Sequence, residues 1–148
     1  MTIERKSAPE CHALLGEGYI FLDVRTEEEF RQGHAPGAYN LPWAFTANHG
    51  MQPNPDFMAQ VKALFPTDSK LVIGCAGGVR SLKAAEQMAA EGYQHLVDLR
   101  PGMVGSRNML WMKTEQGWRD VGLPMTQQAE EGRSYEELEA RWREASGS

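Results

Sequence analysis

The sequence predicts an α/β domain whose sheet is mainly parallel. Short apolar runs of strand length alternate with helical stretches along most of the chain, and this alternation is typical of βαβ connections. The length of 148 residues suits one domain with a single core. An apolar content of 41% and a charged content of 24% are those of an ordinary globular protein.

The predicted strands are apolar runs bounded by glycine or proline turns. Their ranges are Tyr19–Val24, Ala38–Leu41, Leu71–Gly74 and Leu96–Leu99. In such sheets the ligand crevice lies beyond the carboxyl ends of the strands. We therefore expect a site formed by the Asp23-Val-Arg25 run, Cys75 and the loop after Leu99.

The predicted helices show capping boxes or apolar residues at helical spacing. Ser7-Ala-Pro-Glu10 and Thr26-Glu-Glu-Glu29 are capping boxes, and Ser134-Tyr-Glu-Glu137 opens a last amphipathic helix. The predicted ranges are 7 to about 15, 26 to about 32, 56–65, 81–91 and 134 to about 145.

The remaining segments lack a clear period. Residues 43–55 contain Asn, Gly and two prolines, and we interpret them as a loop. Residues 102–117 are rich in Met, and we expect one helix there. Residues 127–132 form a polar linker, so we divide the chain into a domain at 1–126 and a linker with a C-terminal helix at 127–148.

Composition excludes several classes of partner. The net charge is −5 and no basic stripe is present, so nucleic acid is a poor candidate partner. No apolar run has the length to span a bilayer, and the first residues lack the apolar core of a signal peptide. We expect no membrane association and a cytoplasmic location. His12, His49 and His95 show no metal-ligand spacing, so we expect no metal.

Cys75 is the most informative residue of the chain. The apolar strand at 71–74 delivers it to a glycine-bearing loop, Ala76-Gly-Gly-Val-Arg80, and Ser81 then opens a helix. Backbone N–H groups and the positive end of a helix favour a thiolate there, and the thiolate is the nucleophilic form. We therefore expect Cys75 to be a free, reactive thiol, and Cys11 to lie in the core.

Several segments together resemble the rhodanese family of sulfurtransferases in its single-domain form. Their positions are Phe21-Leu-Asp-Val-Arg25 with Glu29-Phe30, Gly33-His-Ala-Pro-Gly-Ala38 with Asn40-Leu-Pro42, Cys75-Ala-Gly-Gly-Val-Arg-Ser81, and Gly122-Leu-Pro124 after Trp118. The resemblance covers roughly residues 3 to 125. It implies a central, mainly parallel five-stranded sheet flanked by helices on both faces, to which the C-terminal helix is an addition.

The resemblance also implies a reaction. In that family the loop cysteine takes a sulfane sulfur from a donor such as thiosulfate and passes it to a thiophilic acceptor, cyanide or a thiol. Here Cys75 would carry the sulfur as a persulfide, with no other cofactor. The substrate-binding residues would be Ala76, Gly77, Gly78, Val79, Arg80 and Ser81 together with Arg25. The expected partners are a small-molecule donor and acceptor, and a sulfur-relay protein is a further candidate. We expect a monomer or a homodimer.

Two departures from the family pattern concern the donor. Positions 76–79 are uncharged, so Arg80 and the loop amides must bind an anionic donor alone. A low-molecular-weight persulfide is therefore a donor candidate beside thiosulfate. The second departure follows Leu99. Where the family has a glycine pair with a tryptophan nearby, this chain has Pro101-Gly102, and Trp118 lies much farther along. The extra length is an insertion of about ten residues, which we expect to line the substrate mouth.

Other interpretations of the same residues stay open. Arg80 can bind substrate or brace the loop through a salt bridge, and Arg25 can pair with a carboxylate instead of touching substrate. A non-enzymatic sulfur carrier or docking module needs the same loop. A cysteine phosphatase or arsenate reductase would place five residues between Cys and Arg, whereas four lie between Cys75 and Arg80.

Overall fold

The fold is built on one parallel sheet. The structure is a computed structural model that describes residues 3–48 and 50–147. Within these residues, five strands pair in the order β1-β7-β6-β2-β3, and every pairing is parallel. Their bounds are Glu4–Lys6 for β1, Ile20–Asp23 for β2, Tyr39–Asn40 for β3, Lys70–Gly74 for β6 and His95–Leu99 for β7.

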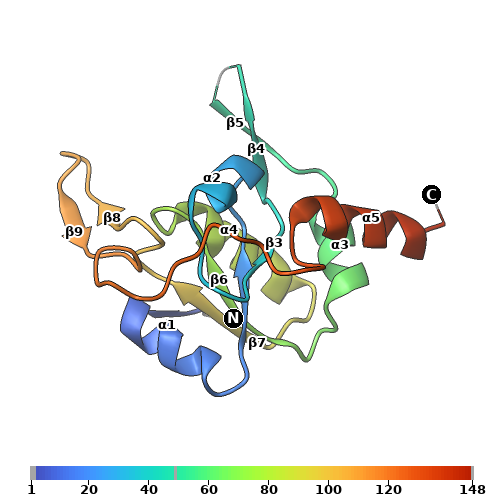
Figure 1. Cartoon of the computed structure of the whole chain (residues 1–148), viewed down its shortest axis with the longest axis horizontal. Coiled ribbons are helices and arrows are strands. Elements are labelled where there is room, and N and C mark those ends of the chain that lie inside the picture. The colour runs from blue at the N-terminus through green and yellow to red at the C-terminus, as the bar shows by residue number, and fades with distance from the viewer. Residues whose placement is uncertain (1–2, 49, 148) are drawn as a thin grey trace.

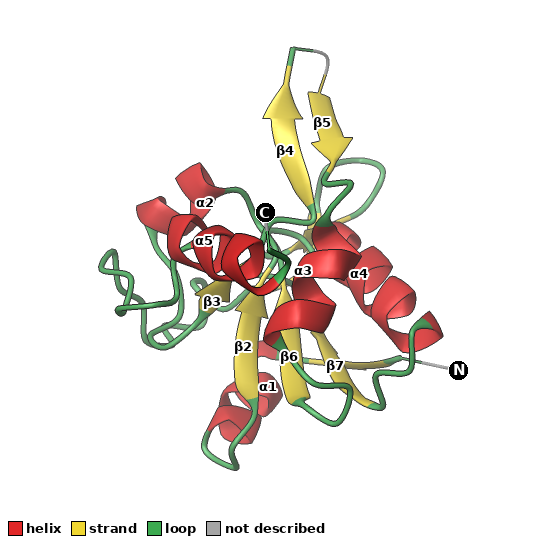
Figure 2. Ribbon diagram, turned by 90° about the vertical axis from the view of Figure 1, so that its right-hand side faces the viewer, coloured by secondary structure: helices red, strands yellow, loops and turns green. Residues whose placement is uncertain are grey.

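Helices cover both faces of this sheet (Figure 1; Figure 2). Side chains alternate along each strand, so Leu71 and Ile73 face one core cluster and Val72 faces the other. On the Val72 side lie α1 (Ala8–Leu15) and α2 (Glu27–Gln32). On the opposite side lie α3 (Phe57–Leu64), α4 (Val79–Ala90) and α5 (Tyr135–Ala145). The predicted fold class, with its five-stranded sheet, two helical layers and C-terminal helix, is confirmed.

The predicted helix starts are confirmed in atomic detail. Ser7 and Glu10 form a reciprocal capping box at α1, and Thr26 and Glu29 form another at α2. These caps fix where the chain turns away from the sheet. The start of α4 differs from the prediction, because this helix begins at Val79, two residues earlier than expected.

Two segments were predicted wrongly, and both fold as antiparallel hairpins. Residues 43–55, predicted as a loop, contain β4 (Ala44–Ala47) paired with β5 (Gly50–Pro53). Residues 102–117, predicted to hold a helix, contain β8 (Ser106–Arg107) paired with β9 (Lys113–Glu115). Gly102 and Gly105 have φ values of +69° and +101°, which interrupt a right-handed helix. Both hairpins project from the body of the protein (Figure 1).

Strand β1 has no counterpart among the predicted strands. Its sequence is Glu-Arg-Lys, so it lacks the apolar run by which strands are recognised. Backbone pairing to β7 at the sheet edge places it, with Arg5 in register with Asp98. Among residues 3–48 and 50–147, no helix is both long enough and apolar enough to cross a bilayer.

The C-terminal helix packs onto the core. Leu138 is fully buried, and Tyr135 belongs to the core cluster beside α3, with its hydroxyl accepting a 2.9 Å hydrogen bond from Gln60 Nε2. Figure 2 shows α5 lying beside α3. The chain boundary at residue 126 stays a prediction.

Replacing Leu138 by alanine tests how much α5 stabilises the domain. We expect Leu138→Ala to lower the free energy of unfolding by about 2–5 kcal/mol, because it removes buried apolar contacts and leaves a cavity. Urea denaturation measures the change. Arg141→Ala, at an exposed position of the same helix, is the matched control and should have little effect. Equal effects of the two variants would mean that α5 adds no core contact.

Candidate functional site

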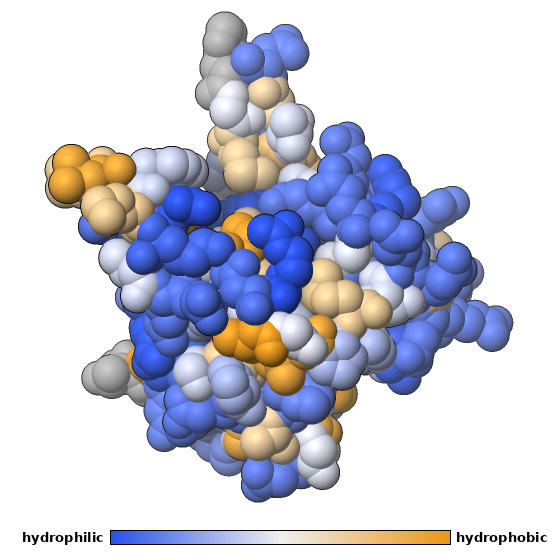
Figure 3. All heavy atoms as spheres, turned by 60° about the vertical axis from the view of Figure 1, so that its left-hand side comes forward, coloured by the Kyte–Doolittle hydropathy of each residue, from blue (hydrophilic) through white to orange (hydrophobic). Residues whose placement is uncertain are grey.

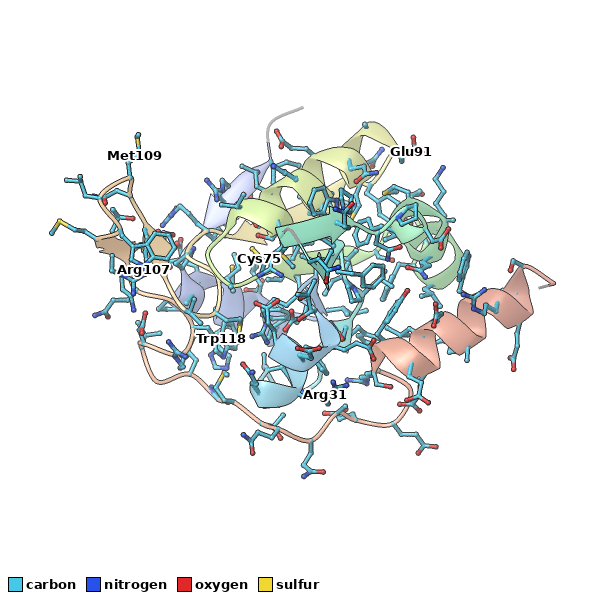
Figure 4. All side chains as sticks on the ribbon, turned by 90° about the horizontal axis from the view of Figure 1, so that it is seen from above. Arg31, Cys75, Glu91, Arg107, Met109 and Trp118 are labelled. Carbon is cyan, nitrogen blue, oxygen red and sulfur yellow. The ribbon has the colours of Figure 1, made fainter. Side chains whose placement is uncertain are left out.

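Strand β6 carries Cys75 to the middle of the carboxyl edge of the sheet. It lies between β7 and β2, and Cys75 follows directly after Gly74. A side chain at Gly74 would meet the Phe21 ring at 2.7 Å, so glycine lets the strand pack closely against its neighbour. The labelled Cys75 lies in the interior of the molecule in Figure 4, at the start of the loop that leads into α4.

The sulfur of Cys75 is held by two backbone amides and one hydroxyl. The N–H groups of Gly78 and Ser81 donate to Sγ at 3.1 and 3.3 Å, and the thiol donates to Ser81 Oγ at 3.3 Å. Ser81 lies in the first turn of α4, where backbone N–H groups have no partner inside the helix. Cys75 is only 1% exposed. The site therefore offers the sulfur a small set of aligned dipoles out of contact with bulk water.

The loop is shaped by its close approach to the segment that follows β7. Gly78 has a φ of +93°, and a Cβ at this position would lie 2.1 Å from the carbonyl oxygen of Arg100. A Cβ on Gly102 would lie 2.3 Å from the carbonyl oxygen of Ala76. Hydrogen bonds from the amides of Met103 and Val104 to the carbonyls of Cys75 and Ala76 hold the two segments together. Glycine is therefore required on both sides of the contact.

Two arginines near the loop, Arg80 and Arg25, are paired with carboxylates. Arg80 donates two hydrogen bonds to Glu29, at 2.7 and 2.9 Å. Burial would lower the pKa of Arg80, but the hydrogen bonds and the charge of Glu29 outweigh it, and the pKa is raised. Burial likewise would raise the pKa of Glu29, but Arg80 keeps it lowered. The loop-bracing alternative for Arg80 is therefore realised, and its charge is neutralised by Glu29.

Arg25 is likewise occupied. Its guanidinium donates to both carboxylate oxygens of Asp23, at 2.8 to 3.2 Å, and to the carbonyl oxygen of Gly33 at 2.7 Å. Arg25 and Ala76 line the same cavity of about 120 Å³, together with Met103, Val104 and Arg119. The beginning of the predicted insertion thus borders this cavity, whereas its labelled Met109 lies far out on the hairpin in Figure 4.

The other predicted loop residues contribute in different ways. Among the loop amides, those of Gly78 and Ser81 reach the sulfur, while Ala76 and Gly77 form the turn next to it. Val79 is 66% exposed and opens α4 at the surface. The structure thus brings Cys75, Gly78 and Ser81 together and leaves Val79 facing solvent.

The second thiol and the histidines lie in different settings. Cys11 is buried within α1, and burial, with smaller contributions from Asp98 and Glu10, raises its pKa to about 12. His34 braces its turn through a 2.7 Å hydrogen bond between Nδ1 and the carbonyl oxygen of Phe30. His49 lies outside the described residues. Among the residues that are described, no group of three or more His, Cys, Asp or Glu side chains could hold a metal ion.

Three residues near the site carried no sequence signal for it. Glu29 was predicted as a capping residue and as part of the rhodanese-like motif, but not as the partner of Arg80, and Arg5 and Asp98 were not predicted to lie near the site. Arg5 donates to Asp98 Oδ2 at 2.7 Å and to the carbonyl oxygen of Gly78 at 3.1 Å. Only the pairing of β1 with β7 could have indicated this pair.

Comparisons with known proteins agree with this geometry. The model of the Rhodanese-like domain matches residues 7–109. Over 118 residues the chain is 42% identical to "Thiosulfate sulfurtransferase 16, chloroplastic" of Arabidopsis thaliana, covering 80% of this chain and 88% of that protein. It is 32% identical over 124 residues to "Thiosulfate sulfurtransferase 18" of the same plant, covering 82% of each.

A solved structure shows the same fold. The crystal structure of Rv0390 from M. tuberculosis superimposes with a TM-score of 0.71 at 24% identity, covering 86% of this chain and 100% of that one. At this identity the likeness concerns the fold alone. The predicted rhodanese-like fold is thereby confirmed. Because the family model matches more than half of the chain, the chain belongs to the family of rhodanese-like domains.

Proposed function

We propose that this protein is a sulfurtransferase in which Cys75 carries a sulfane sulfur as a persulfide. The observation that supports this most is the placement of two backbone N–H groups, from Gly78 and Ser81, on one buried sulfur. These N–H groups stabilise an anion on Cys75 Sγ. Two relatives bear the name thiosulfate sulfurtransferase, which agrees with the proposal.

The first half of the reaction follows thiol–disulfide exchange. The Cys75 thiolate attacks the outer sulfur of a donor, a new S–S bond forms, and the old bond to that sulfur breaks. With thiosulfate the leaving group is sulfite, which takes the electron pair. In the second half an acceptor, cyanide or a thiol, attacks the outer sulfur and restores the Cys75 thiolate. No cofactor takes part apart from this transient persulfide.

The charge around the loop favours donors of low charge. Arg80 and Arg25 are both neutralised by carboxylates, so neither offers thiosulfate a free positive charge, and Arg119 on the cavity wall is the cation that stays available to it. A low-molecular-weight persulfide needs less anion binding than thiosulfate does. Both remain donors in this proposal, with the persulfide favoured by the paired arginines.

A sulfur-carrier module is the second candidate. The observation that favours it is the tip of the β8–β9 hairpin, which exposes Met109, Leu110, Trp111 and Met112. Figure 3 shows apolar surface gathered on this projection. A carrier would receive sulfur on Cys75 from a relay protein and would not turn over with cyanide.

We further propose that the protein is a cytoplasmic monomer or homodimer. We propose that it acts without nucleic acid, metal or membrane.

Intact mass spectrometry tests where the sulfur is carried. After incubation with thiosulfate or glutathione persulfide, we expect the protein to gain the mass of one sulfur atom. Cys75→Ser should abolish this gain, and Cys11→Ser should retain it, because the Cys11 thiol is buried with a pKa of about 12. A gain that survives Cys75→Ser would assign the chemistry to another residue. A gain without turnover in the presence of cyanide would favour the carrier.

Replacing Glu29 by glutamine tests the charge argument. Glutamine keeps the capping box of α2, yet it removes the charge that neutralises Arg80. We expect the KM for thiosulfate to fall about two- to fivefold in Glu29→Gln, since a partly exposed ion pair contributes less than about 1 kcal/mol. Steady-state kinetics with thiosulfate and with a persulfide of lower net charge measures the difference.

The control for this test is Glu139→Gln, which breaks the Arg143–Glu139 ion pair on α5. It should leave both KM values unchanged. The lowered pKa of Glu29 means that this carboxylate stays ionised through the neutral range, so the effect should persist across it. An equal rise in KM for both donors would show that Glu29 acts on the loop structure and not on donor charge.

A further inference from the structure

Arg119 is a cation on the wall of the cavity next to the Cys75 loop. It lines this cavity of about 120 Å³ together with Ala76, the residue that follows Cys75. The other two charged residues of the wall, Arg25 and Glu29, are each engaged in an ion pair. No residue that the structure describes forms an ion pair with Arg119. Its positive charge is therefore free to meet a ligand in this cavity.

The acid that follows Arg119 in the chain is occupied by other groups. Asp120 Oδ2 accepts a 2.7 Å hydrogen bond from Lys113 Nζ and a 2.8 Å hydrogen bond from the amide of Gly117. Lys113 belongs to β9 of the inserted hairpin. The insertion thus supplies the counter-ion of Asp120, and Arg119 stays without one.

Backbone hydrogen bonds fix the position from which the Arg119 side chain starts. The amide of Arg119 donates to the carbonyl of Met103 at 3.0 Å, and the amide of Met103 donates to the carbonyl of Cys75 at 2.8 Å. Trp118, labelled in Figure 4, is fully buried, and its indole N–H donates to the carbonyl of Pro124 at 2.8 Å. The peptide group of Arg119 is therefore tied to that of Cys75 through one intervening residue.

The rest of the cavity wall suits a small anionic group. Met103, Val104 and Met125 give it apolar sides, and Gln32, the last residue of α2, has a side-chain amide that can donate a hydrogen bond. The guanidinium of Arg119 presents paired N–H groups that match two oxygens of a sulfonate or a carboxylate. Apolar sides with a few polar groups are typical of small-molecule sites.

We propose that Arg119 binds the anionic oxygen group of the sulfur donor and so sets the class of donor that the protein accepts. The inference rests on the proposed sulfur transfer at Cys75. The donor class is a small sulfane-sulfur compound that carries a sulfonate-like group, as thiosulfate does, or a carboxylate. Arg119 is a specificity-determining residue, and it takes no part in breaking the S–S bond of the donor.

The first test compares two alkylating reagents of similar size at Cys75, in a Cys11→Ser background. Iodoacetate is an anion and iodoacetamide is neutral, so the ratio of their rates reports positive charge near the sulfur and cancels changes in thiolate reactivity. We expect Arg119→Gln to lower the iodoacetate-to-iodoacetamide ratio about three- to fivefold, the size of a partly exposed charge contact. Arg119→Lys should keep most of the ratio. Arg141→Gln, at an exposed position of α5, is the control and should not change it.

The second test measures steady-state kinetics with cyanide as acceptor and three donors. These are thiosulfate, glutathione persulfide, which carries carboxylates, and the persulfide of 2-mercaptoethanol, which carries none. We expect Arg119→Gln to raise the KM for an anionic donor about three- to fivefold at unchanged kcat, because a binding contact is lost. A rise for thiosulfate alone would assign the sulfonate-like group, and a rise for glutathione persulfide alone would assign the carboxylate. The KM for the third donor should not change.

Two outcomes would overturn the inference. An unchanged reagent ratio in Arg119→Gln would mean that this charge does not act at the sulfur. An equal rise in KM for all three donors would make Arg119 a structural residue of the loop. If no donor adds sulfur to Cys75, the proposed function fails, whereas the alkylation ratio still decides the role of Arg119.

Sulfate binding provides a further measurement that needs no reaction at Cys75. In an NMR titration of the unmodified protein with sodium sulfate, the side-chain Nε–H signal of Arg119 should shift and reach saturation. Sodium chloride at the same ionic strength should not reproduce the shift. An Arg119 signal that responds equally to both salts would refute an anion site at this residue.

Discussion

The site depends on a backbone contact between the Cys75 loop and the segment that follows β7. Gly78 lies against the carbonyl of Arg100, and Gly102 lies against the carbonyl of Ala76, at distances that leave no room for a Cβ. This contact holds Gly78 in the left-handed conformation that directs its N–H at the sulfur. The loop amides are therefore aligned by tertiary packing before any substrate arrives, and this prior alignment makes dipoles effective in stabilising an anion.

Three arginines near the loop, Arg5, Arg25 and Arg80, are each paired with a carboxylate. Asp23, Glu29 and Asp98 each accept hydrogen bonds from one arginine, so the loop is bordered by three ion pairs. An anion on Cys75 is then stabilised by fixed dipoles at short range, and the arginines keep the loop and its neighbours in place.

Much of the fold and the central cysteine could be predicted from sequence, because those features are local. The capping boxes at Ser7 and Thr26, the apolar run before Cys75 and the glycines after it each act within a few residues. The two hairpins and β1 could not be predicted, since they depend on pairing with distant or neighbouring strands and lack an apolar alternation. The partners of Arg80 and Arg5 could not be predicted for the same reason. Glu29 lies 51 residues from Arg80 and Asp98 lies on a strand that only the sheet order brings close.

Burial of the Cys75 thiol also bears on the proposed sulfur transfer. Cys75 is 1% exposed, so an acceptor reaches Sγ less readily than it reaches an atom nearer the surface. A persulfide places the reactive sulfur about 2 Å beyond Sγ, the length of one S–S bond. The cavity of about 120 Å³ is lined by Ala76, the residue that follows Cys75 in the chain. Under the proposed sulfur transfer, we expect small nucleophiles to reach the outer sulfur more readily than large acceptors, which would need an extended thiol.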